Sequence, residues 1–347
     1  MSKIRVLKLR QPPYAWFSHL NKLSRLEEFD FDYGVVPSLS HRHPEFERHP
    51  NYQVLYLNKC ASLRRLSLCG TEFRREFKLY CRIPQTLSIL HLSNMPIDSA
   101  LKIVSRCPNL TELKLDQLGD PHEGESIPLW FGQSVKLGRL KSLTWGRRPS
   151  LSDTRWLDAF LAHIDVPALS QLETIDRIHN AVRSSPKELD FFQRISSNIH
   201  SLRFTESTCL DIPGYVRFFT PDSPVERLDL VDCHYRVFNQ VVRALTPDSK
   251  GKSMPWLQSL YVSGGNEFEL FDVDPTPVNV ELGPECLAPL TRTLERRLAA
   301  GDTFSLKLDD ALVEWTYGLQ ERLRALVRKG VRLEIIEDGD PVDWLKD

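Results

Sequence analysis

The amino-acid sequence predicts an α/β fold in which short repeats stack into a curved solenoid, with a parallel β-sheet along the concave face. Three observations predict this fold. One apolar pattern recurs along the chain, the segments between its copies have helical periodicity, and 41% of the residues are hydrophobic while 26% are charged, as in a packed globular protein. We therefore expect a single array of about 12 irregular units over residues 1–347, shaped like a horseshoe, with helices and irregular segments on its convex face.

Each predicted strand carries an apolar residue, two further residues, a second apolar residue, one residue, and a third apolar residue. Strand side chains alternate between the two faces, so the second and third apolar residues point together into the interior. The clear copies are Ile4, Leu7 and Leu9; Leu26, Phe29 and Phe31; Leu63, Leu66 and Leu68; Leu87, Leu90 and Leu92; Leu110, Leu113 and Leu115; Leu140, Leu143 and Trp145; Ile199, Leu202 and Phe204; Val225, Leu228 and Leu230; and Leu257, Leu260 and Val262.

Weaker copies complete the array. They are Leu172 with Ile175 in the middle position; Phe304, Leu306 and Leu308; and Leu333 with Ile335. From Leu7 to Leu333 the copies lie about 30 residues apart, near the upper end of the period of leucine-rich repeats.

The segments between the strands are predicted to be helices, because apolar residues recur on one side at i, i+4 and i+7 or i+8. The stripes are Ile97, Leu101 and Val104; Trp156, Phe160 and Ile164; and Val237, Val241 and Leu245. Another helix is expected over about 186–195, because Ser185 suits the N-cap, Pro186 the first helical position, and Glu188 a capping box. This helix is predicted to bury Leu189, Phe192 and Ile195.

Residues 312–347 are predicted to form a capping repeat that closes the C-terminal side of the core. The apolar stripe of its helix is Leu312, Trp315, Leu319, Leu323, Leu326 and Val327, and a strand over 331–336 follows. Two insertions, near 33–50 and 264–289, interrupt the period and are expected to be irregular loops.

No cofactor and no metal site is predicted. The three histidines of the first insertion, His41, His43 and His49, could ligate a metal, but no carboxylate or cysteine framework accompanies them, so a solvated loop is favoured. The acidic residues of the second insertion lack the glycine turn and spacing of a calcium loop. Phosphate-binding, dinucleotide-binding, hydrolase and metalloprotease motifs do not occur in the sequence, so we expect no catalytic residues and no enzyme activity.

The charge balance and the cysteine content indicate which partners and which cellular compartment to expect. The chain has 45 Lys+Arg and 46 Asp+Glu residues, a net charge of −1, so nucleic acid and membrane surfaces are not expected partners. No Cys-x-x-Cys pair occurs, and residues 1–10 lack the apolar stretch of a signal peptide. We expect reduced thiols and a cytoplasmic or nuclear location.

The approaches to two strands share one feature. In the stretches 58–63 and 105–110 a cysteine, Cys60 or Cys107, stands three residues before the first strand leucine and is expected to end a helix. The stretch Cys107 to Leu115 resembles the cysteine-containing class of leucine-rich repeats that is common in F-box substrate receptors of cullin-type ubiquitin ligases. The helix and strand from Leu319 to Ile336 resemble divergent fungal proteins of that kind.

This resemblance implies a substrate-recruiting solenoid coupled to an N-terminal F-box that docks on the ligase adaptor. The chain departs from the family here, because a strand from Ile4 to Leu9 is predicted where the family has a helix-rich segment. Three interpretations stay open: the adaptor-binding module is lost, the sequence is short of it, or the ligase role does not apply.

The outward strand residues are the candidate partner-binding residues, because a solenoid of this kind offers its concave face to its partners. They are Glu28, Asp30, Asp32, Arg65, His91, Glu112, Lys114, Asp116, Arg203, Arg227, Asp229 and Tyr261. Their mixed charges favour a protein partner, such as a ligase substrate, over a lipid or a polyanion. The alternatives are solvated strand residues without a role, a scaffold unrelated to ubiquitination, and a GTPase-activating repeat protein that would use Arg10.

Overall fold

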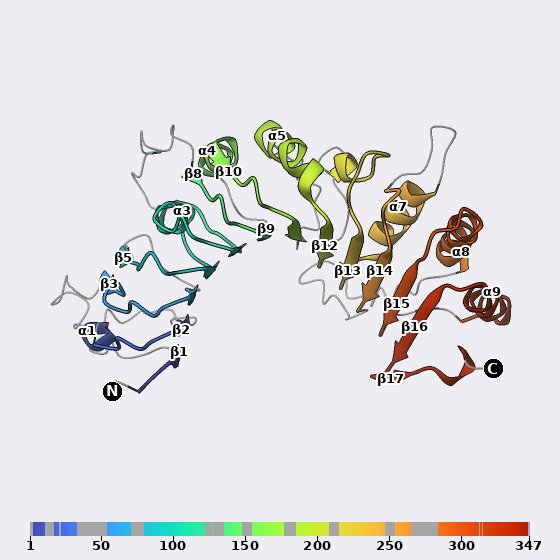
Figure 1. Cartoon of the computed structure of the whole chain (residues 1–347), viewed down its shortest axis with the longest axis horizontal. Coiled ribbons are helices and arrows are strands. Elements are labelled where there is room, and N and C mark those ends of the chain that lie inside the picture. Colours follow the sequence, from blue (N-terminus) through green and yellow to red (C-terminus); the bar gives the residue numbers. More distant parts are fainter. Residues whose placement is uncertain are drawn as a thin grey trace, which may run out of the picture. The chain divides into compact units, whose positions relative to one another are not determined.

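The computed structural model describes residues 3–10, 17–20, 22–32, 54–70, 80–121, 127, 135–147, 155–176, 185–207, 215–246, 254–264, 284–311, 313 and 315–345. It contains two compact units, Met1–Leu169 and Ser170–Asp347. Each unit is a mixed α/β structure with a mostly parallel sheet, and the helices lie on one side of that sheet (Figure 1).

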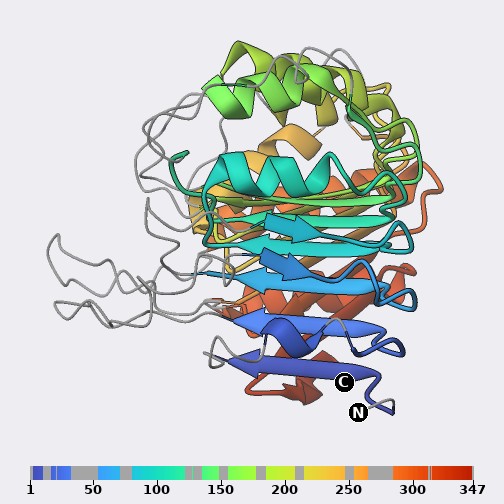
Figure 2. The same ribbon diagram turned by 90° about the vertical axis from the view of Figure 1, so that its left-hand side faces the viewer.

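The sheet of the first unit is parallel throughout. Its strands are β1 (Val6–Arg10), β2 (Glu28–Asp32), β4 (Arg65–Cys69), β6 (Ile89–Ser93), β7 (Glu112–Asp116) and β9 (Ser142–Arg147), in that order. Figure 2 shows the strands of this sheet side by side and pointing in the same direction. The helices are α1 (Phe17–Leu20), α3 (Ile97–Val104) and α4 (Arg155–His163). Two small parallel pairs lie on the helix side: β3 (Val54–Tyr56) with β5 (Tyr80–Arg82), and β8 (Val135–Lys136) with β10 (Ile164–Asp165).

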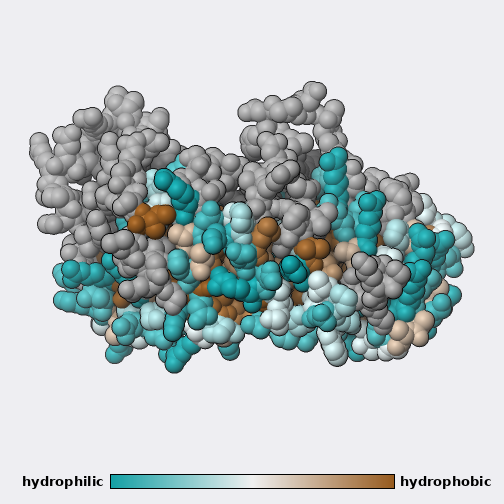
Figure 3. Space-filling model, turned by 90° about the horizontal axis from the view of Figure 1, so that it is seen from above, coloured by the Kyte–Doolittle hydropathy of each residue, from teal (hydrophilic) through white to brown (hydrophobic). Residues whose placement is uncertain are grey.

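The sheet of the second unit is parallel except at its last strand. Its strands are β11 (Gln171–Asp176), β12 (Ser201–Thr205), β13 (Arg227–Val231), β14 (Ser259–Ser263), β15 (Ser305–Asp309), β16 (Arg332–Glu337) and the antiparallel β17 (Asp340–Pro341). The helices are α5 (Pro186–Ile195), α7 (Tyr235–Leu245), α8 (Pro284–Ala299) and α9 (Tyr317–Arg328), and the short 3-10 turns are η4 (Ser196–Asn198), η5 (Val216–Phe218) and η6 (Asp343–Leu345). From the helix side, the described surface is mostly hydrophilic, with hydrophobic residues in separate small groups (Figure 3).

The inward sides of both sheets are lined by the apolar ladder that the sequence pattern predicts. The register aligns Leu7, Phe29, Leu66, Leu90, Leu113 and Leu143 in the first unit, and Leu172, Leu202, Leu228, Leu260, Leu306 and Leu333 in the second. Leu7 and Leu333 are half-buried, and the others are between 0% and 2% exposed. Each such burial contributes about 1.5–3 kcal/mol, so this ladder supplies much of the driving force for folding.

The register corrects the predicted repeat at Leu172 and Ile175. Leu172 aligns with Leu202 and therefore takes the middle position, while Ile175 aligns with Thr205 on the opposite side of the sheet. The third inward residue is Thr174, which is 2% exposed. The prediction was wrong because an apolar residue one position further along the strand masked a polar residue at the inward position.

A repeated hydrogen-bond arrangement explains why two residues, and not one, separate the first and second apolar positions of the repeat. At each such site two successive backbone N–H groups donate to one carbonyl that lies just before or at the start of the preceding strand, as at Arg64 and Arg65 to Glu27 O (2.8 and 3.1 Å). The extra residue is thus accommodated as a bulge. The repeats at β15 and β16 have one intervening residue instead, and there Ser305 N donates alone to Gln258 O at 2.8 Å. The copy beginning at Phe304 is weak in sequence for this reason.

Most of the predicted helices are confirmed. Ser185 Oγ accepts a hydrogen bond from Glu188 N at 3.1 Å, so the N-cap of α5 is as expected. The predicted buried face is partly wrong, because α5 buries Phe191 in place of Leu189, which is half-buried. The reason is the packing of Phe192, whose ring centroid lies 5.2 Å from that of Tyr215. This packing turns the face of residues 188, 191, 192 and 195 towards the core.

Three further expectations need correction. Ile164 is buried in β10 and not in a helix. Cys60 follows the short strand β3, so only Cys107 lies just after a helix, where its thiol donates to Ile103 O at 3.3 Å. The second insertion is not a loop throughout, because α8 begins at Pro284, a residue suited to the first turn of a helix. Residues 33–50 lie outside the described residues.

The C-terminal segment contains the helix and strand that the sequence predicts. Helix α9 buries Leu319, Leu323 and Leu326, and β17 pairs with the end of β16. Trp315 precedes the helix instead of lying within it, and its ring centroid lies 5.1 Å from that of Trp344. Leu312 lies outside the described residues. The single array and its capping repeat stay predictions.

Candidate interaction surface on the strand faces

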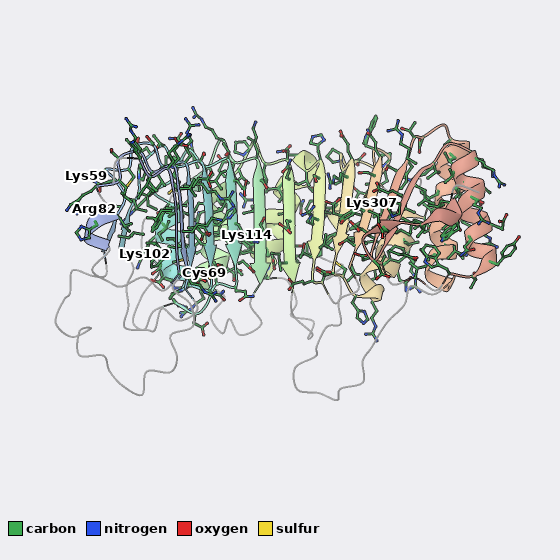
Figure 4. The ribbon with its side chains drawn as sticks, turned by 90° about the horizontal axis from the view of Figure 1, so that it is seen from below. Lys59, Cys69, Arg82, Lys102, Lys114 and Lys307 are labelled. Atoms are coloured by element: carbon green, nitrogen blue, oxygen red, sulfur yellow. The ribbon has the colours of Figure 1, made fainter. Side chains whose placement is uncertain are left out.

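The outward side chains of each sheet form rows, because the parallel strands are in register. The central row of the first unit is Lys8, Asp30, Ser67, His91, Lys114 and Thr144. The central row of the second unit is Glu173, Arg203, Asp229, Tyr261, Lys307 and Glu334. Figure 4 shows Lys114 and Lys307 on the strand faces of their units.

The other predicted residues flank these rows. Glu28, Arg65 and Glu112 share the preceding row of the first unit, and Arg227 holds the equivalent position in the second. Asp32 and Asp116 end their strands. Each unit thus brings its own predicted residues together on one face of its sheet.

Asp229 is the centre of a charge cluster in the second unit. Its Oδ2 accepts hydrogen bonds from Arg203 Nη2 at 2.8 Å and Arg203 Nε at 3.1 Å, and its Oδ1 accepts one from Arg227 Nε at 2.9 Å. The hydrogen bond to Asp229 raises the pKa of the Arg227 guanidinium. The Asp229 side chain is only 2% exposed, so the two arginines replace the water that it has lost.

A second cluster surrounds Tyr261 and Lys307. Tyr261 Oη donates to Asp309 Oδ2 at 2.8 Å, and Lys307 Nζ lies 3.0 Å from Glu334 Oε1 and 3.8 Å from Asp309 Oδ2. The ammonium group also lies 5.9 Å from the Tyr261 ring centroid, within reach of a cation–π contact. Burial raises the pKa of the Tyr261 hydroxyl, so it stays protonated and donates at neutral pH. At the other end of the row, Thr205 Oγ1 donates to Glu173 Oε1 at 2.9 Å.

In the described part of the first unit, the strand face contains fewer internal pairs. His91 Nε2 lies 2.6 Å from Glu112 Oε1, and Arg10 Nε lies 3.7 Å from Asp32 Oδ2. Among the described residues, ion pairs and side-chain hydrogen bonds are lacking for a further set of outward charges: Glu28, Asp30, Arg65 and Lys114. This unit therefore presents charges whose interactions the fold does not already satisfy.

Asp116 departs from the expectation of an outward contact residue. It is 8% exposed, because it lies against Gly146, where an added Cβ atom would come within 2.3 Å of Asp116 Oδ1. The close approach of β9 thus covers this carboxylate. Asp229 is buried as well, and it contributes to the surface through the arginines that it holds.

Several residues of these clusters were missed by sequence reasoning: Glu173, Lys307, Asp309 and Glu334. Lys307 lies between Leu306 and Leu308 and Glu334 between Leu333 and Ile335, so the alternation rule could have identified both. They were missed because these copies of the repeat are weak. The pairing itself has no sequence signal, because it depends on side-chain positions across neighbouring strands.

The remaining candidate sites lie in the two insertions. The histidines of the first insertion and the acidic residues at 272–281 lie outside the described residues. Within the described ranges, His, Cys, Asp and Glu side chains form no group of three that could hold a metal ion. None of the described helices combines the length and apolar character needed to cross a bilayer.

The chain was compared with known proteins. No family model matches it, and no curated protein is significantly similar to it in sequence. The functional reading therefore depends on the strand faces themselves: guanidinium, ammonium and carboxylate groups in fixed rows, which can make ion pairs and directional hydrogen bonds with an opposing surface.

Proposed function

We propose that the chain is a leucine-rich-repeat solenoid that binds a protein partner through the outward faces of its strands, without catalytic residues. The observation that carries the proposal is the register of the two central rows, which sets charged and polar groups side by side on adjoining parallel strands. Strands held by a packed leucine ladder keep these groups in a constant arrangement. Little conformational entropy is then lost on binding.

The charge pattern supports a protein partner. Acidic and basic residues alternate over short distances, as in the Arg203, Asp229 and Arg227 cluster, so a uniformly charged polymer or membrane would meet repulsion as well as attraction. A folded protein or peptide can match such a pattern group by group. The proposed partner class is therefore protein.

Within that class, we propose recruitment of substrates to a cullin-type ubiquitin ligase, on the basis of the resemblance of Cys107 to Leu115 to the repeats of F-box receptors. The buried Cys107 thiol at the end of α3 suits such a repeat, since it packs as a small apolar group. The alternative is a scaffold unrelated to ubiquitination. These two roles share the same strand face and differ in whether the ligase adaptor is bound.

Site-specific photocrosslinking tests the proposed binding face. p-Benzoylphenylalanine placed at Ser67 or Ser259, on the strand faces, should crosslink the same protein in native cells, identified by mass spectrometry. The control position is Tyr317, which is 76% exposed at the start of α9 on the helix side. Equal crosslinking from Tyr317 and the strand positions would contradict binding through the strand faces.

Co-purification tests the ligase role separately. The chain is purified from its native cell under mild conditions, and the cullin-ligase adaptor is quantified by mass spectrometry. Stoichiometric adaptor would support the receptor role. Its absence, together with a crosslinked partner at Ser67 or Ser259, would leave the scaffold role.

A further inference from the structure

We infer that the partner is held mainly by the first unit, through a segment that places a basic side chain at Asp30 and an acidic side chain at Lys114. This inference rests on the proposed function and names the chemistry of the partner. It depends on which charges of the two faces are already paired within the fold.

Lys114 is the first of the two anchor points. It lies half-buried in the central row, between His91 and the buried Thr144. His91 contacts Glu112, so this carboxylate is already engaged, and Lys114 makes no ion pair among the described residues. The Lys114 residue is half-buried, and its ammonium group has no protein acceptor among the described residues. An incoming carboxylate would supply that acceptor.

Asp30 is the second anchor point. Its register neighbours are Lys8 on one side and Ser67 on the other, yet in the described part of the chain its half-buried carboxylate makes no ion pair or hydrogen bond with them. The flanking Glu28 has no ionic partner there either, so β2 carries two carboxylates without an ion pair among the described residues. A lysine or arginine of the partner is the complementary group.

The second unit offers no comparable pair of anchors in its central row. Arg203 is bound to Asp229, Lys307 to Glu334, and Tyr261 to Asp309. A partner that engaged these groups would have to break existing contacts, so the net gain would be small. Contacts with the second unit are expected to add shape complementarity more than binding energy.

The spacing of the anchors constrains the partner. Asp30 on β2 and Lys114 on β7 are three strands apart in one row, a distance of about 14 Å at the usual separation of about 4.8 Å between strands. An extended segment rises about 3.3 Å per residue, so its basic and acidic residues should be about four positions apart. The segment then crosses the strands with its basic residue over β2 and its acidic residue over β7.

The test uses a random linear 12-residue peptide library displayed on phage and selected on the full chain. Enriched peptides are expected to carry a basic and an acidic residue about four positions apart. In fluorescence polarisation with the best peptide, Lys114→Ala and Asp30→Asn should each weaken binding about tenfold or more. The control Lys329→Ala, which removes an exposed lysine at the end of α9 on the helix side, should change binding less than about twofold.

Exchanging the two charges tests whether the single variants act directly on the contact with the peptide. The double variant Asp30→Lys, Lys114→Glu should bind the selected peptide poorly and recover binding to a peptide with the two charged residues exchanged. Enriched peptides that bind both single variants as tightly as the unaltered chain would overturn the inference, and so would an equal loss of binding with the control Lys329→Ala.

The outcome also separates the inference from the proposed function. If a cellular partner crosslinks at Ser67 or Ser259 but is unaffected by Lys114→Ala and Asp30→Asn, strand-face binding stands and the inference fails. If no peptide is enriched and no strand position crosslinks a partner, both fail.

Discussion

Arg203 and Asp229 face each other on the neighbouring strands β12 and β13, with Arg203 Nη2 2.8 Å from Asp229 Oδ2. The aspartate side chain is 2% exposed and the arginine side chain 40% exposed. The pair is therefore asymmetric: a buried anion orients a cation that solvent and a partner can still reach. With Arg227 on the other carboxylate oxygen, one aspartate fixes the positions of two guanidinium groups on the strand face.

Asp229→Asn should destabilise the second unit by about 1–3 kcal/mol, because the amide keeps the shape but loses the charge that both arginines contact. The measurement is the urea midpoint of unfolding. Glu334→Gln is the matched control, since it removes one exposed carboxylate from Lys307 and should cost no more than about 1 kcal/mol. Equal losses of stability in the two variants would show that the buried Asp229 carboxylate contributes no more stability than the exposed Glu334 carboxylate.

Asp232→Asn should stabilise the protein at neutral pH. Burial and the nearby Glu206 carboxylate raise the pKa of Asp232, so the folded state binds the proton more tightly than the unfolded state. This carboxyl therefore costs stability as the pH rises from the usual carboxyl range through the raised pKa, and costs nothing below that range. The backbone at position 232 has φ 50°, a region that asparagine tolerates as aspartate does.

The advantage of Asp232→Asn should shrink towards zero as the pH falls below the usual range of carboxyl groups, because both side chains are then neutral. Urea unfolding between about pH 3 and pH 8 measures this trend. Asp222→Asn, a change at an exposed aspartate, controls for the loss of one negative charge. An advantage that is constant with pH would contradict the electrostatic origin.

The strands and their inward faces are predictable because leucine spacing and side-chain alternation are local properties of the sequence. Leu66, Leu90 and Leu113 align in the structure as the pattern requires. The repeat at Leu172 was misaligned because Thr174, a polar residue, holds an inward position that the pattern expects to be apolar. The register of such a strand is decided by its hydrogen-bonded neighbours.

The candidate surface is predictable as a face, but not as a set of contacts. Alternation correctly places Arg203, Asp229 and Tyr261 outward, yet it cannot show that Asp229 is covered by two arginines or that Asp116 is covered beside Gly146. Those outcomes depend on distances between side chains of different strands. The division between paired and unpaired charges therefore emerges only from the structure.

Gly264→Ala should destabilise the protein more than Gly301→Ala. Both glycines have left-handed backbones, with φ 86° and 84°, so alanine costs about 1–2 kcal/mol at either position. At Gly264 an added Cβ would also lie 1.8 Å from Asp232 Oδ1, whereas at Gly301 nothing lies within 4 Å. The difference between the two urea midpoints measures the cost of displacing Asp232.

A shortened neighbour tests this explanation of the Gly264 effect. In an Asp232→Ala background, Gly264→Ala should lose most of its additional cost, because the carboxyl group that the Cβ would meet is gone and only the contact with the Cα of residue 232, at 3.1 Å, remains. An unchanged additional cost would place the strain elsewhere in the backbone around Gly264.

Arg297→Met should destabilise the second unit by about 2–4 kcal/mol, because the Arg297 guanidinium satisfies two carbonyl groups that the fold buries. Nη1 donates to Leu257 O at 3.0 Å and Nη2 to Met254 O at 2.7 Å, in the turn before β14. Methionine keeps much of the side-chain volume but cannot donate to either oxygen.

The neighbouring exposed residue supplies the control, Arg296→Met, which should change the free energy of unfolding in urea by no more than about 0.5 kcal/mol. Arg297→Lys should fall between the two, since one ammonium group cannot reproduce both directional bonds. Equal stability of the Arg297→Met and Arg296→Met proteins would show that these carbonyl groups do not depend on Arg297 for their hydrogen bonds.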